Sequence, residues 1–312
     1  MHKWYKGNIH THTNESDGDS DPEVVVDYFV EHNYDFLVLS DHNHLTILDY
    51  GKDKPDLLLI PGEEVTIREP FNIHVGAVGI ESYVEPVYGK DSLDTLNANI
   101  KAIQTANGIP ILNHPNYKWA VDDKMIIKSE NLKFFEVFNG GTHANDLGDM
   151  RDGNKKNTDQ IWDSVLSSGK LIYGVATDDS HHYKVFHSTF SNPGRGWVMV
   201  KSNSDSQNDI LENFEMGNFY SSTGVYISDI FIDKNEIRID IDLNPTQIHI
   251  LSPKITDQQF KTEFIGHNGE ILSVSDDITP SYKIKGDEKY IRAVITSSDG
   301  YKAWIQPCFL SD

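Results

Sequence analysis

Residues 8–12 read Asn-Ile-His-Thr-His, and the interpretation of the whole chain starts from this stretch. Ile9 belongs to a predicted first strand, and His10 and His12 stand at its end on either side of Thr11. Because side chains alternate between the two faces of a strand, both imidazoles point to one side and can share a metal ion. A single histidine at a strand end is more often an ordinary hydrogen-bonded residue, so the pair gains weight only from the rest of the chain.

Short apolar runs alternate with amphipathic stretches over the first 224 residues. We expect strands at 36–40, 57–60, 73–78, 109–112, 134–138, 172–176 and 197–200, and helices at 22–31, 93–106, 159–167 and 209–216. Asp21 and Pro22 mark the start of the first helix, as N-cap and first helical residue. Strands that alternate with helices predict parallel βα units, and this number of units predicts a barrel.

The pattern changes after Gly224. Short predicted strands follow at 230–232, 237–241, 247–251, 282–284 and 290–296, separated by turns, and no amphipathic helix is evident. We therefore expect an α/β domain over residues 1–224 and a small all-β domain, sandwich-like, over residues 225–312.

Acidic and imidazole side chains gather just after the predicted strands of the first domain. They are His10, His12, Asp17, Asp41, His42, Glu63, Glu64, His74, His114, Asp178, Asp179 and His181. In a barrel the carboxyl ends of the strands form one rim, so we expect these distant positions to converge. The single cysteine, Cys308, cannot build a thiolate site. Imidazole and carboxylate ligands suit zinc, manganese or iron.

Charge and hydropathy exclude two classes of partner. The formal net charge is −21, from 27 basic and 48 acidic residues, which argues against long nucleic acids, because their binding depends on Lys and Arg. Apolar runs such as residues 57–60 are far shorter than the roughly 20 residues of a membrane span, so we expect no membrane segment. The N-terminus lacks the apolar core of a signal peptide. We expect a cytoplasmic protein; a secreted protein whose signal has been removed would look the same.

The motifs resemble those of the PHP (polymerase and histidinol phosphatase) superfamily, over residues 4 to about 224. The matching segments are His10-Thr11-His12, Ser16-Asp17-Gly18, Ser40-Asp41-His42, Gly62-Glu63-Glu64, His74, His114-Pro115 and Asp179-Ser180-His181. Segments such as Glu136–Gly140, Gly194–Trp197 and Phe219–Gly224 look like the subgroup that includes carbamate and aryl-ester hydrolases.

This resemblance implies a distorted (β/α)7 barrel that holds two or three divalent ions of manganese, zinc or iron. It implies one ion held by His10, His12, Glu64 and Asp179, a second held by Glu64, His74 and His114, and a third held by Asp17, His42 and His181. The position in each motif favours Glu64 over Glu63 and Asp179 over Asp178 as ligands. Asp178 and Asp41 would instead orient imidazoles by accepting their second N–H.

The same resemblance implies hydrolysis by water that the metal ions activate. We expect a phosphoesterase for a small anionic monoester or diester, with Glu64, Asp179 and His181 in catalysis and Arg195 as anchor for the anionic group. A carbamate or carboxyl-ester hydrolase with the same metal centre is the alternative, and a non-catalytic metal-binding scaffold is a remote one. The β domain could support an oligomer.

Overall fold

The structure is a computed structural model that describes residues 2–48, 57–149, 155–243 and 258–310. Its helices are α1 (Pro22–Glu31), α2 (Ser92–Thr105), α3 (Asp123–Lys128), α4 (Thr158–Ser167) and α5 (Gln207–Glu215), with single 3₁₀ turns at Tyr117–Trp119 and His267–Gly269. Its strands in the first part of the chain are β1 (Lys3–Asn8), β2 (Phe36–Leu37), β3 (Leu58–Leu59), β4 (Gly62–Ile67), β5 (Ile73–Val78), β6 (Ile109–Leu112), β7 (Phe134–Asn139), β8 (Tyr173–Thr177), β9 (Trp197–Ser202) and β10 (Phe219–Ser222). The remaining strands are β11 (Ile227–Ile232), β12 (Glu236–Ile241), β13 (Phe260–Ile265), β14 (Ile271–Ser275), β15 (Ser281–Lys283), β16 (Tyr290–Ser297) and β17 (Lys302–Phe309).

The four predicted helices are confirmed to within two residues at each end. Capping residues at the helix ends explain why the helix boundaries could be predicted from the sequence. Asp91 accepts a hydrogen bond from the amide of Asp94 at the start of α2, and Asn157 forms a capping box with Gln160 at the start of α4. The short helix α3 was not predicted, and the predicted strand at 247–251 lies outside the described residues.

The strands form a mixed α/β structure in several sheets, and a (β/α)7 barrel is not confirmed. Nine strands run in the order β14-β13-β16-β17-β10-β9-β1-β2-β3, five in the order β4-β5-β6-β7-β8, and three in the order β11-β12-β15. Among the described residues these sheets do not join into a closed barrel. The reason lies at β4 and β5, which pair antiparallel with no helix between them, so the parallel βα repeat is interrupted.

Two isolated parallel bridges connect the nine-stranded and five-stranded sheets beyond the ends of their strands. Thr11 pairs with Ser180, and His42 pairs with Glu64. The segments that follow β1, β2 and β8 therefore meet β4 at one edge of the molecule. The expected convergence of strand ends thus occurs although the barrel is open.

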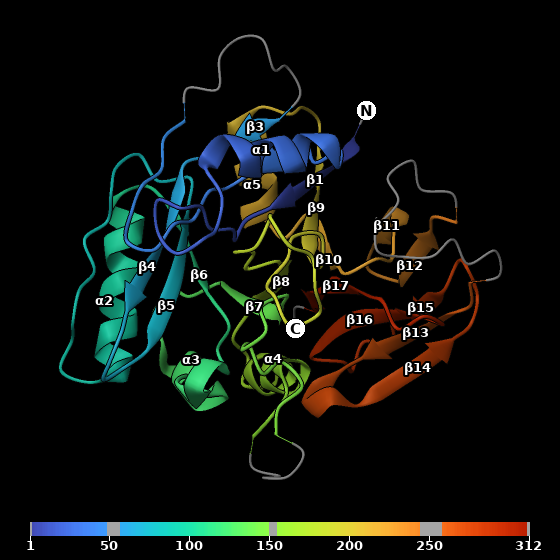
Figure 1. Cartoon of the computed structure of the whole chain (residues 1–312). Helices are drawn as coiled ribbons and strands as arrows, with labels where there is room; N and C mark the ends of the chain where they lie inside the picture. The colour runs from blue at the N-terminus through green and yellow to red at the C-terminus, as the bar shows by residue number, and fades with distance from the viewer. Residues whose placement is uncertain (1, 49–56, 150–154, 244–257, 311–312) are drawn as a thin grey trace.

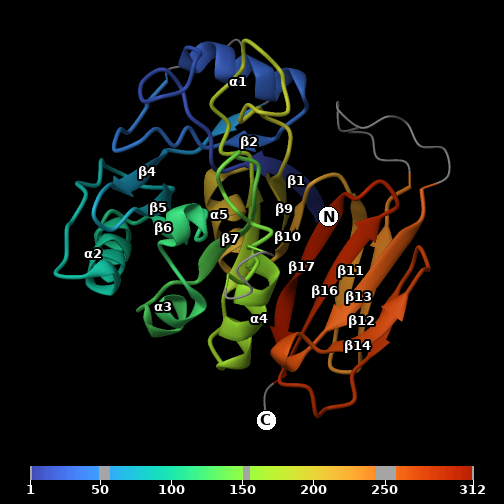
Figure 2. The same ribbon diagram turned by 60° about the horizontal axis from the view of Figure 1, so that its bottom comes forward.

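The C-terminal strands lie to one side of the α/β part (Figure 1). The nine-stranded sheet continues across residue 224, where β10 pairs antiparallel with β17 from Tyr220–Ile305 to Ser222–Ala303. Helix α4 lies against β16 and β17 (Figure 2), and the buried Arg292 of β16 binds Asp159 and Asp163 of α4. The domain boundary at 224 stays a prediction, because one sheet and one ion-pair network span it.

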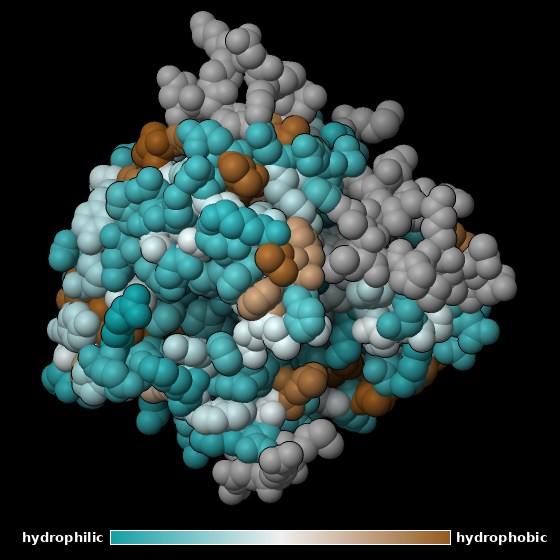
Figure 3. Space-filling view, viewed as in Figure 1, coloured by the Kyte–Doolittle hydropathy of each residue, from teal (hydrophilic) through white to brown (hydrophobic). Residues whose placement is uncertain are grey.

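The surface agrees with the charge of the chain. On the face shown in Figure 3 hydrophilic residues predominate, and hydrophobic ones are scattered among them. Among the described residues, no helix has the length and apolar character needed to cross a membrane. The apolar side chains lie instead in the interior, with Trp162, Trp197 and Tyr220 among the largest that are fully buried.

Candidate metal centre

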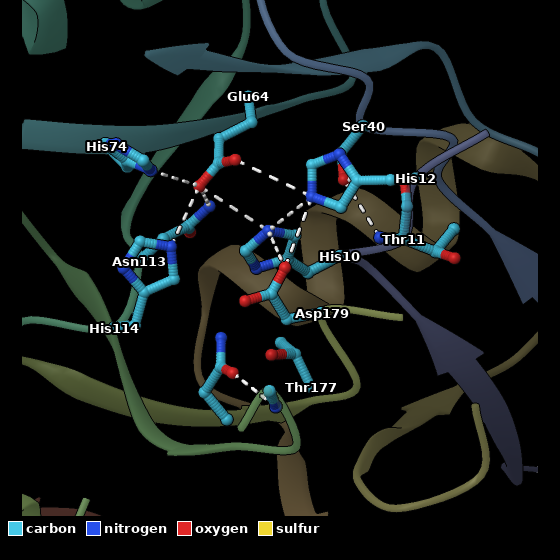
Figure 4. A network of polar contacts seen from close by, with 12 residues as sticks. His10, Thr11, His12, Ser40, Glu64, His74, Asn113, His114, Thr177 and Asp179 are labelled. Carbon is cyan, nitrogen blue, oxygen red and sulfur yellow. Dashed lines mark hydrogen bonds and ion pairs between the residues drawn. The ribbon is translucent and has the colours of Figure 1, made fainter. Parts of the chain in front are cut away.

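Nine of the side chains named from the sequence converge where the segments after β1, β2 and β8 meet β4, β5 and β6. Figure 4 shows six of them: His10, His12, Glu64, His74, His114 and Asp179. The nine form overlapping groups of potential ligands: His10, His12 and Asp179; His10, Glu64 and His114; His42, Glu64 and His74; and His12, Asp17, His42 and His181. Six imidazoles and three carboxylates, four of them buried and only Asp17 exposed, thus face one another. Bringing so many polar and charged groups together away from water costs free energy unless a cation or hydrogen-bond partners compensate them.

The first group has the spacing of a tetrahedral metal site. Nε2 of His10 lies 3.1 Å from Nε2 of His12, and Oδ1 of Asp179 lies 3.2 Å and 3.3 Å from these two nitrogens. Metal–nitrogen bonds of about 2.0–2.1 Å at tetrahedral angles separate ligand atoms by about 3.3 Å. The three atoms therefore fit three corners around one ion, and Oε1 of Glu64, at 3.5 Å from His10 Nε2, lies near the fourth.

Glu64 lies at the centre of the cluster. Its Oε1 atom is 3.3 Å from Nδ1 of His74 and 3.2 Å from Nε2 of His114, spacings that again match the edge of a coordination tetrahedron. Oε2 of Glu64 and Nδ1 of His74 are buried, and each faces a side chain of the same cluster at ion-pair distance. A carboxylate that faces histidines on both sides is placed to bridge two ions.

Asp17, His42 and His181, the third of the ligand sets predicted from the sequence, lie at the mouth of the cluster. Oδ1 of Asp17 is 3.2 Å from Nε2 of His181, and Oδ2 of Asp17 is 3.5 Å from Nε2 of His42. The side chain of Asp17 is 51% exposed, in contrast to the buried Glu64. His42 also reaches Glu64, with Nδ1 2.7 Å from Oε2. His42 thus lies between the second and third groups, and an ion at the third would be open to solvent.

The electrostatics keep the carboxylates charged. Burial by itself raises the pKa of Glu64, but His42, His10 and His74 hold it well below its usual range. Burial by itself also raises the pKa of Asp179, but the neighbouring His10 holds this pKa well below its usual range. Burial lowers the pKa of His12 to about 4, so this imidazole is neutral at physiological pH. Charged carboxylates and a neutral imidazole are the protonation states that bind metals.

Backbone geometry at two of the candidate ligands is unusual. Asp179 has φ of 48° and His114 has φ of 23°, in or near the left-handed region that residues with a Cβ seldom occupy. Such conformations cluster at functional sites, where the surrounding structure imposes them. Here they turn the two side chains back towards the cluster directly after β8 and β6.

Two residues that hold the ligands in place were not assigned that role from the sequence. Oε1 of Glu136 lies 2.7 Å from Nδ1 of His10, and Asn113 donates a hydrogen bond of 2.9 Å to Oε1 of Glu64. Glu136 also accepts hydrogen bonds from Asn139 and Thr177. Its position in the middle of a strand, within a motif of the resemblance, was the signal that could have revealed it.

The expected roles of Asp178 and Asp41 are wrong, because neither carboxylate meets an imidazole. Asp178 accepts hydrogen bonds from the amides of Gly194, Arg195 and Gly196, and burial raises its pKa to about 6. Asp41 accepts from Thr13 N and Oγ1, Ser16 Oγ and Thr46 Oγ1. Both carboxylates therefore fix loops next to the site, and Asp41 secures the loop that presents Asp17.

Neighbouring acids separate as the motif positions predict. Glu64 lies in the cluster, whereas Glu63 points the other way along β4 and accepts a hydrogen bond of 2.6 Å from the amide of Val84. Both lie inside the buried strand β4, which was not among the strands predicted from the sequence.

Arg195 is the one predicted site residue that the structure does not bring to the cluster. Its guanidinium donates hydrogen bonds of 2.8 Å to the carbonyl of Gly140 and 3.3 Å to that of His187. It does not line the cavity in front of the candidate ligands. These contacts hold two loops together, and the anchor role stays a prediction that no contact supports.

A cavity of about 340 Å³ opens in front of the cluster. It is lined by the candidate ligands Asp17, His42, His74, His114, Asp179 and His181, and by Tyr117, Gly141, Thr142, His143, Ala144, His182, Thr189 and Ser191. This volume lies at the small end of the range for ligand pockets, about 300–1,000 Å³. It has room for a small molecule.

Comparison with known proteins places the fold. No family model and no curated protein sequence matches the chain. Among solved structures, the chain is similar to a two-domain protein from Bacteroides vulgatus that contains a predicted PHP-like metal-dependent phosphoesterase, with 16% identity and a TM-score of 0.51 over 98% of this chain and 95% of that one. An amidohydrolase from Chromobacterium violaceum (14% identity, TM-score 0.40, 57% of this chain and 88% of that one) and the lesion-specific endonuclease EndoQ from Pyrococcus furiosus (11% identity, TM-score 0.41, 67% and 55%) are also similar.

The likeness to the Bacteroides protein spans nearly all of both chains, and at 16% identity it speaks for the fold. The chain shares the overall fold of that protein, and the resemblance seen in the sequence motifs is confirmed at the level of the fold. The clustered His, Asp and Glu side chains are ligand types that divalent metal ions bind.

Proposed function

We propose that this protein is a metal-dependent phosphoesterase that hydrolyses a small phosphomonoester or phosphodiester. The observation that carries the proposal is the convergence of nine candidate ligands, with ligand-atom separations of 3.1–3.3 Å in the first two groups. A hydrogen-bonded cluster that binds no cation has no need of so many imidazoles, or of ligand atoms at the spacing of a tetrahedral metal site. The similar protein from Bacteroides vulgatus, which contains a predicted PHP-like metal-dependent phosphoesterase, supports the same class.

The ligand sets proposed here combine the four overlapping groups in the way that the sequence motifs predict. His10, His12, Asp179 and Glu64 would hold one ion, Glu64, His74 and His114 a second, and Asp17, His42 and His181 a third. When bound, divalent ions supply an acidified water and positive charge that offsets the charge developing on the ester oxygens. Residues 1–224 would form the catalytic domain, and residues 225–312 the β domain that packs on it.

The chain's own residues prepare this chemistry by fixing orientation. Glu136 accepts from one ring nitrogen of His10, which leaves Nε2 as the nitrogen that faces the cluster. The carbonyl of Asp179 lies 2.8 Å from Nδ1 of His181 and selects Nε2 in the same way. Preorganised ligands lose little entropy when the ion or the substrate binds, which favours the reaction.

The cavity supports a small substrate rather than a polymer. Its volume of about 340 Å³ holds a phosphate group and a compact alcohol or sugar. The net charge of −21 agrees, because a long nucleic acid would meet repulsion from most of the surface.

Matched chromogenic substrates test the proposal. The metal-free protein, reloaded with Mn²⁺ or Zn²⁺, is assayed with p-nitrophenyl phosphate, bis-p-nitrophenyl phosphate, p-nitrophenyl acetate and a naphthyl carbamate. We expect turnover of a phosphoester that disappears with chelator and returns with metal. Efficient cleavage of the carbamate or acetate without phosphoester turnover would replace the proposed activity with that of a carbamate or carboxyl-ester hydrolase. Metal-replete protein that cleaves none of them would leave only a binding role.

A further inference from the structure

The cavity has a wall that the candidate ligands do not supply. Residues 141–144 and 182–191 form most of it, and the amide of Thr142 donates a hydrogen bond of 3.3 Å to Oγ of Ser191 to join the two segments. His182 lies in this wall, next in sequence to His181. It belongs to none of the groups of potential metal ligands found in the described part of the chain. Its imidazole is therefore available for something other than metal binding.

The ring of His182 is held by packing. It stacks on Phe190 with ring centroids 4.7 Å apart and an angle of 17° between the planes. On the backbone, the amide of His182 donates to the carbonyl of Ser191 at 3.0 Å, and its carbonyl accepts from the side chain of Asn192 at 2.7 Å. The side chain thus has a fixed place without using its own nitrogens.

One ring nitrogen is enclosed and the other is not. Within the described residues, Nδ1 of His182 is buried and has no hydrogen-bond partner. Since a buried N–H without an acceptor is rarely tolerated, the neutral ring carries its proton on Nε2. Because Nδ1 is enclosed, Nε2 is the polar atom through which the ring can reach a molecule in the cavity.

We propose that His182 contacts the substrate, with Nε2 donating a hydrogen bond to an oxygen of the phosphoryl or ester group bound in the cavity. This inference rests on the proposed function, since it assigns a wall residue to the same site. A donor on the wall facing the metal cluster would orient an oxygen that the ions do not bind, and would favour esters with an acceptor at that position. His2 is exposed, does not line the cavity, and offers a control histidine.

Three variants test the assignment on the full-length, metal-replete protein. His182→Phe keeps a ring to stack on Phe190 and removes the nitrogens, His182→Gln restores a donor at a similar reach, and His2→Ala changes an exposed histidine outside the cavity. Calorimetry measures the binding of inorganic phosphate, and steady-state kinetics with the phosphoester that the wild type hydrolyses give kcat/KM. Elemental analysis gives the metal content, and thermal unfolding gives Tm.

We expect His182→Phe to weaken phosphate binding and lower kcat/KM by about 10- to 100-fold, the value of a hydrogen bond to a charged group. Metal content and Tm should match the wild type, His182→Gln should recover part of the loss, and His2→Ala should change phosphate binding and kcat/KM less than about threefold.

The inference is overturned if His182→Phe binds phosphate as tightly as the wild type, or if it loses metal or stability along with activity. Failure of the inference and failure of the proposed function give different results. A wild type that binds phosphate but hydrolyses no ester refutes the proposed function, while the binding data still decide the role of His182. A metal-replete wild type that does not bind phosphate refutes both.

Discussion

Nδ1 of His10 lies 2.7 Å from Oε1 of Glu136, and both side chains are almost wholly buried. This contact determines which nitrogen of His10 faces the other candidate ligands. Glu136 also accepts from the amide of His114, at 2.5 Å, so one carboxylate positions two of the histidines. A residue that binds no ion itself thereby controls the geometry of the centre.

Replacing Glu136 should therefore weaken metal binding without removing a ligand. We expect Glu136→Gln to lower metal affinity by about 10- to 100-fold, the usual effect of losing such a partner. Competition with a chromophoric chelator measures the affinity. Glu130→Gln, at an exposed position, is the control and should bind like the wild type. Unchanged affinity in Glu136→Gln would show that the contact does not orient His10.

Glu64 and Glu63 form an internal pair for testing the ligand assignment. They are neighbours in β4, but only Glu64 faces the histidines. We expect Glu64→Gln to lose bound metal and to reduce turnover by more than about 100-fold. Loss of a residue that only hydrogen-bonds to a ligand already lowers metal affinity or activity by up to about 100-fold, and Glu64 is itself a candidate ligand. Glu63→Gln should retain metal. Elemental analysis measures the bound metal, and steady-state kinetics measure the turnover. Equal metal content in the two variants would contradict the assignment of Glu64 as a ligand.

Metal binding should release protons. Burial lowers the pKa of His42, but Glu64 and Asp17 raise it to about 10 in the metal-free protein, and the pKa of His181 is raised as well. The His42 imidazole is therefore protonated at pH 7.5 and must lose its proton to bind an ion, and the raised pKa of His181 acts in the same direction, so metal affinity should rise with pH. Calorimetry in two buffers of different ionisation enthalpy counts the protons, and a count of zero would contradict the expectation.

The same shifts make an opposite prediction for the metal-free fold. A raised pKa in the folded state stabilises that state fully below the unfolded pKa of about 6.5 and loses this effect as pH rises towards the folded value. The metal-free protein should therefore lose stability between about pH 6.5 and 10. Denaturant unfolding across this range, with and without metal, measures it. A metal-free stability that increases towards pH 10 would contradict the sign.

Arg292 connects the β region to helix α4. Its guanidinium binds Asp163 through Nε at 2.7 Å and Nη2 at 2.8 Å, and it is 1% exposed. Breaking a buried pair of this kind leaves an unpaired charge, and we expect Arg292→Met to cost about 3–5 kcal/mol of unfolding free energy. Arg238→Met removes the half-exposed pair with Asp240 and should cost at most about 1 kcal/mol. Equal Tm values for the two variants would contradict the role of Arg292.

Arg195 offers a test between anchoring and loop support. Because its guanidinium donates to the carbonyls of Gly140 and His187, we expect Arg195→Ala to reduce kcat/KM by a similar factor on anionic phosphoesters and on any neutral ester that is turned over. Steady-state kinetics on both substrates measure the two losses. A rise in KM confined to the anionic substrates would instead support the anchor role expected from the sequence.

Much of the cluster could be predicted because its signals are local. The spacing of His10 and His12, the acid position in Gly62-Glu63-Glu64 and the Asp179-Ser180-His181 motif each set the direction of a side chain within a few residues. Glu136, Asn113 and the wall that carries His182 could not be predicted in the same way. Their roles depend on contacts between segments that lie far apart in the chain, such as Glu136 with His10.

The sequence by itself determined four of the five described helices, the α/β character of the first part, and the identity of the residues that gather at the strand ends, because capping, periodicity and motif spacing act over short distances. Only the tertiary structure decided that the barrel stays open and that one sheet crosses residue 224. It also decided that Asp178, Asp41 and Arg195 hold loops. Pairing between distant strands and the partners of buried polar groups follow from how whole segments pack, and no local pattern of residues specifies that packing.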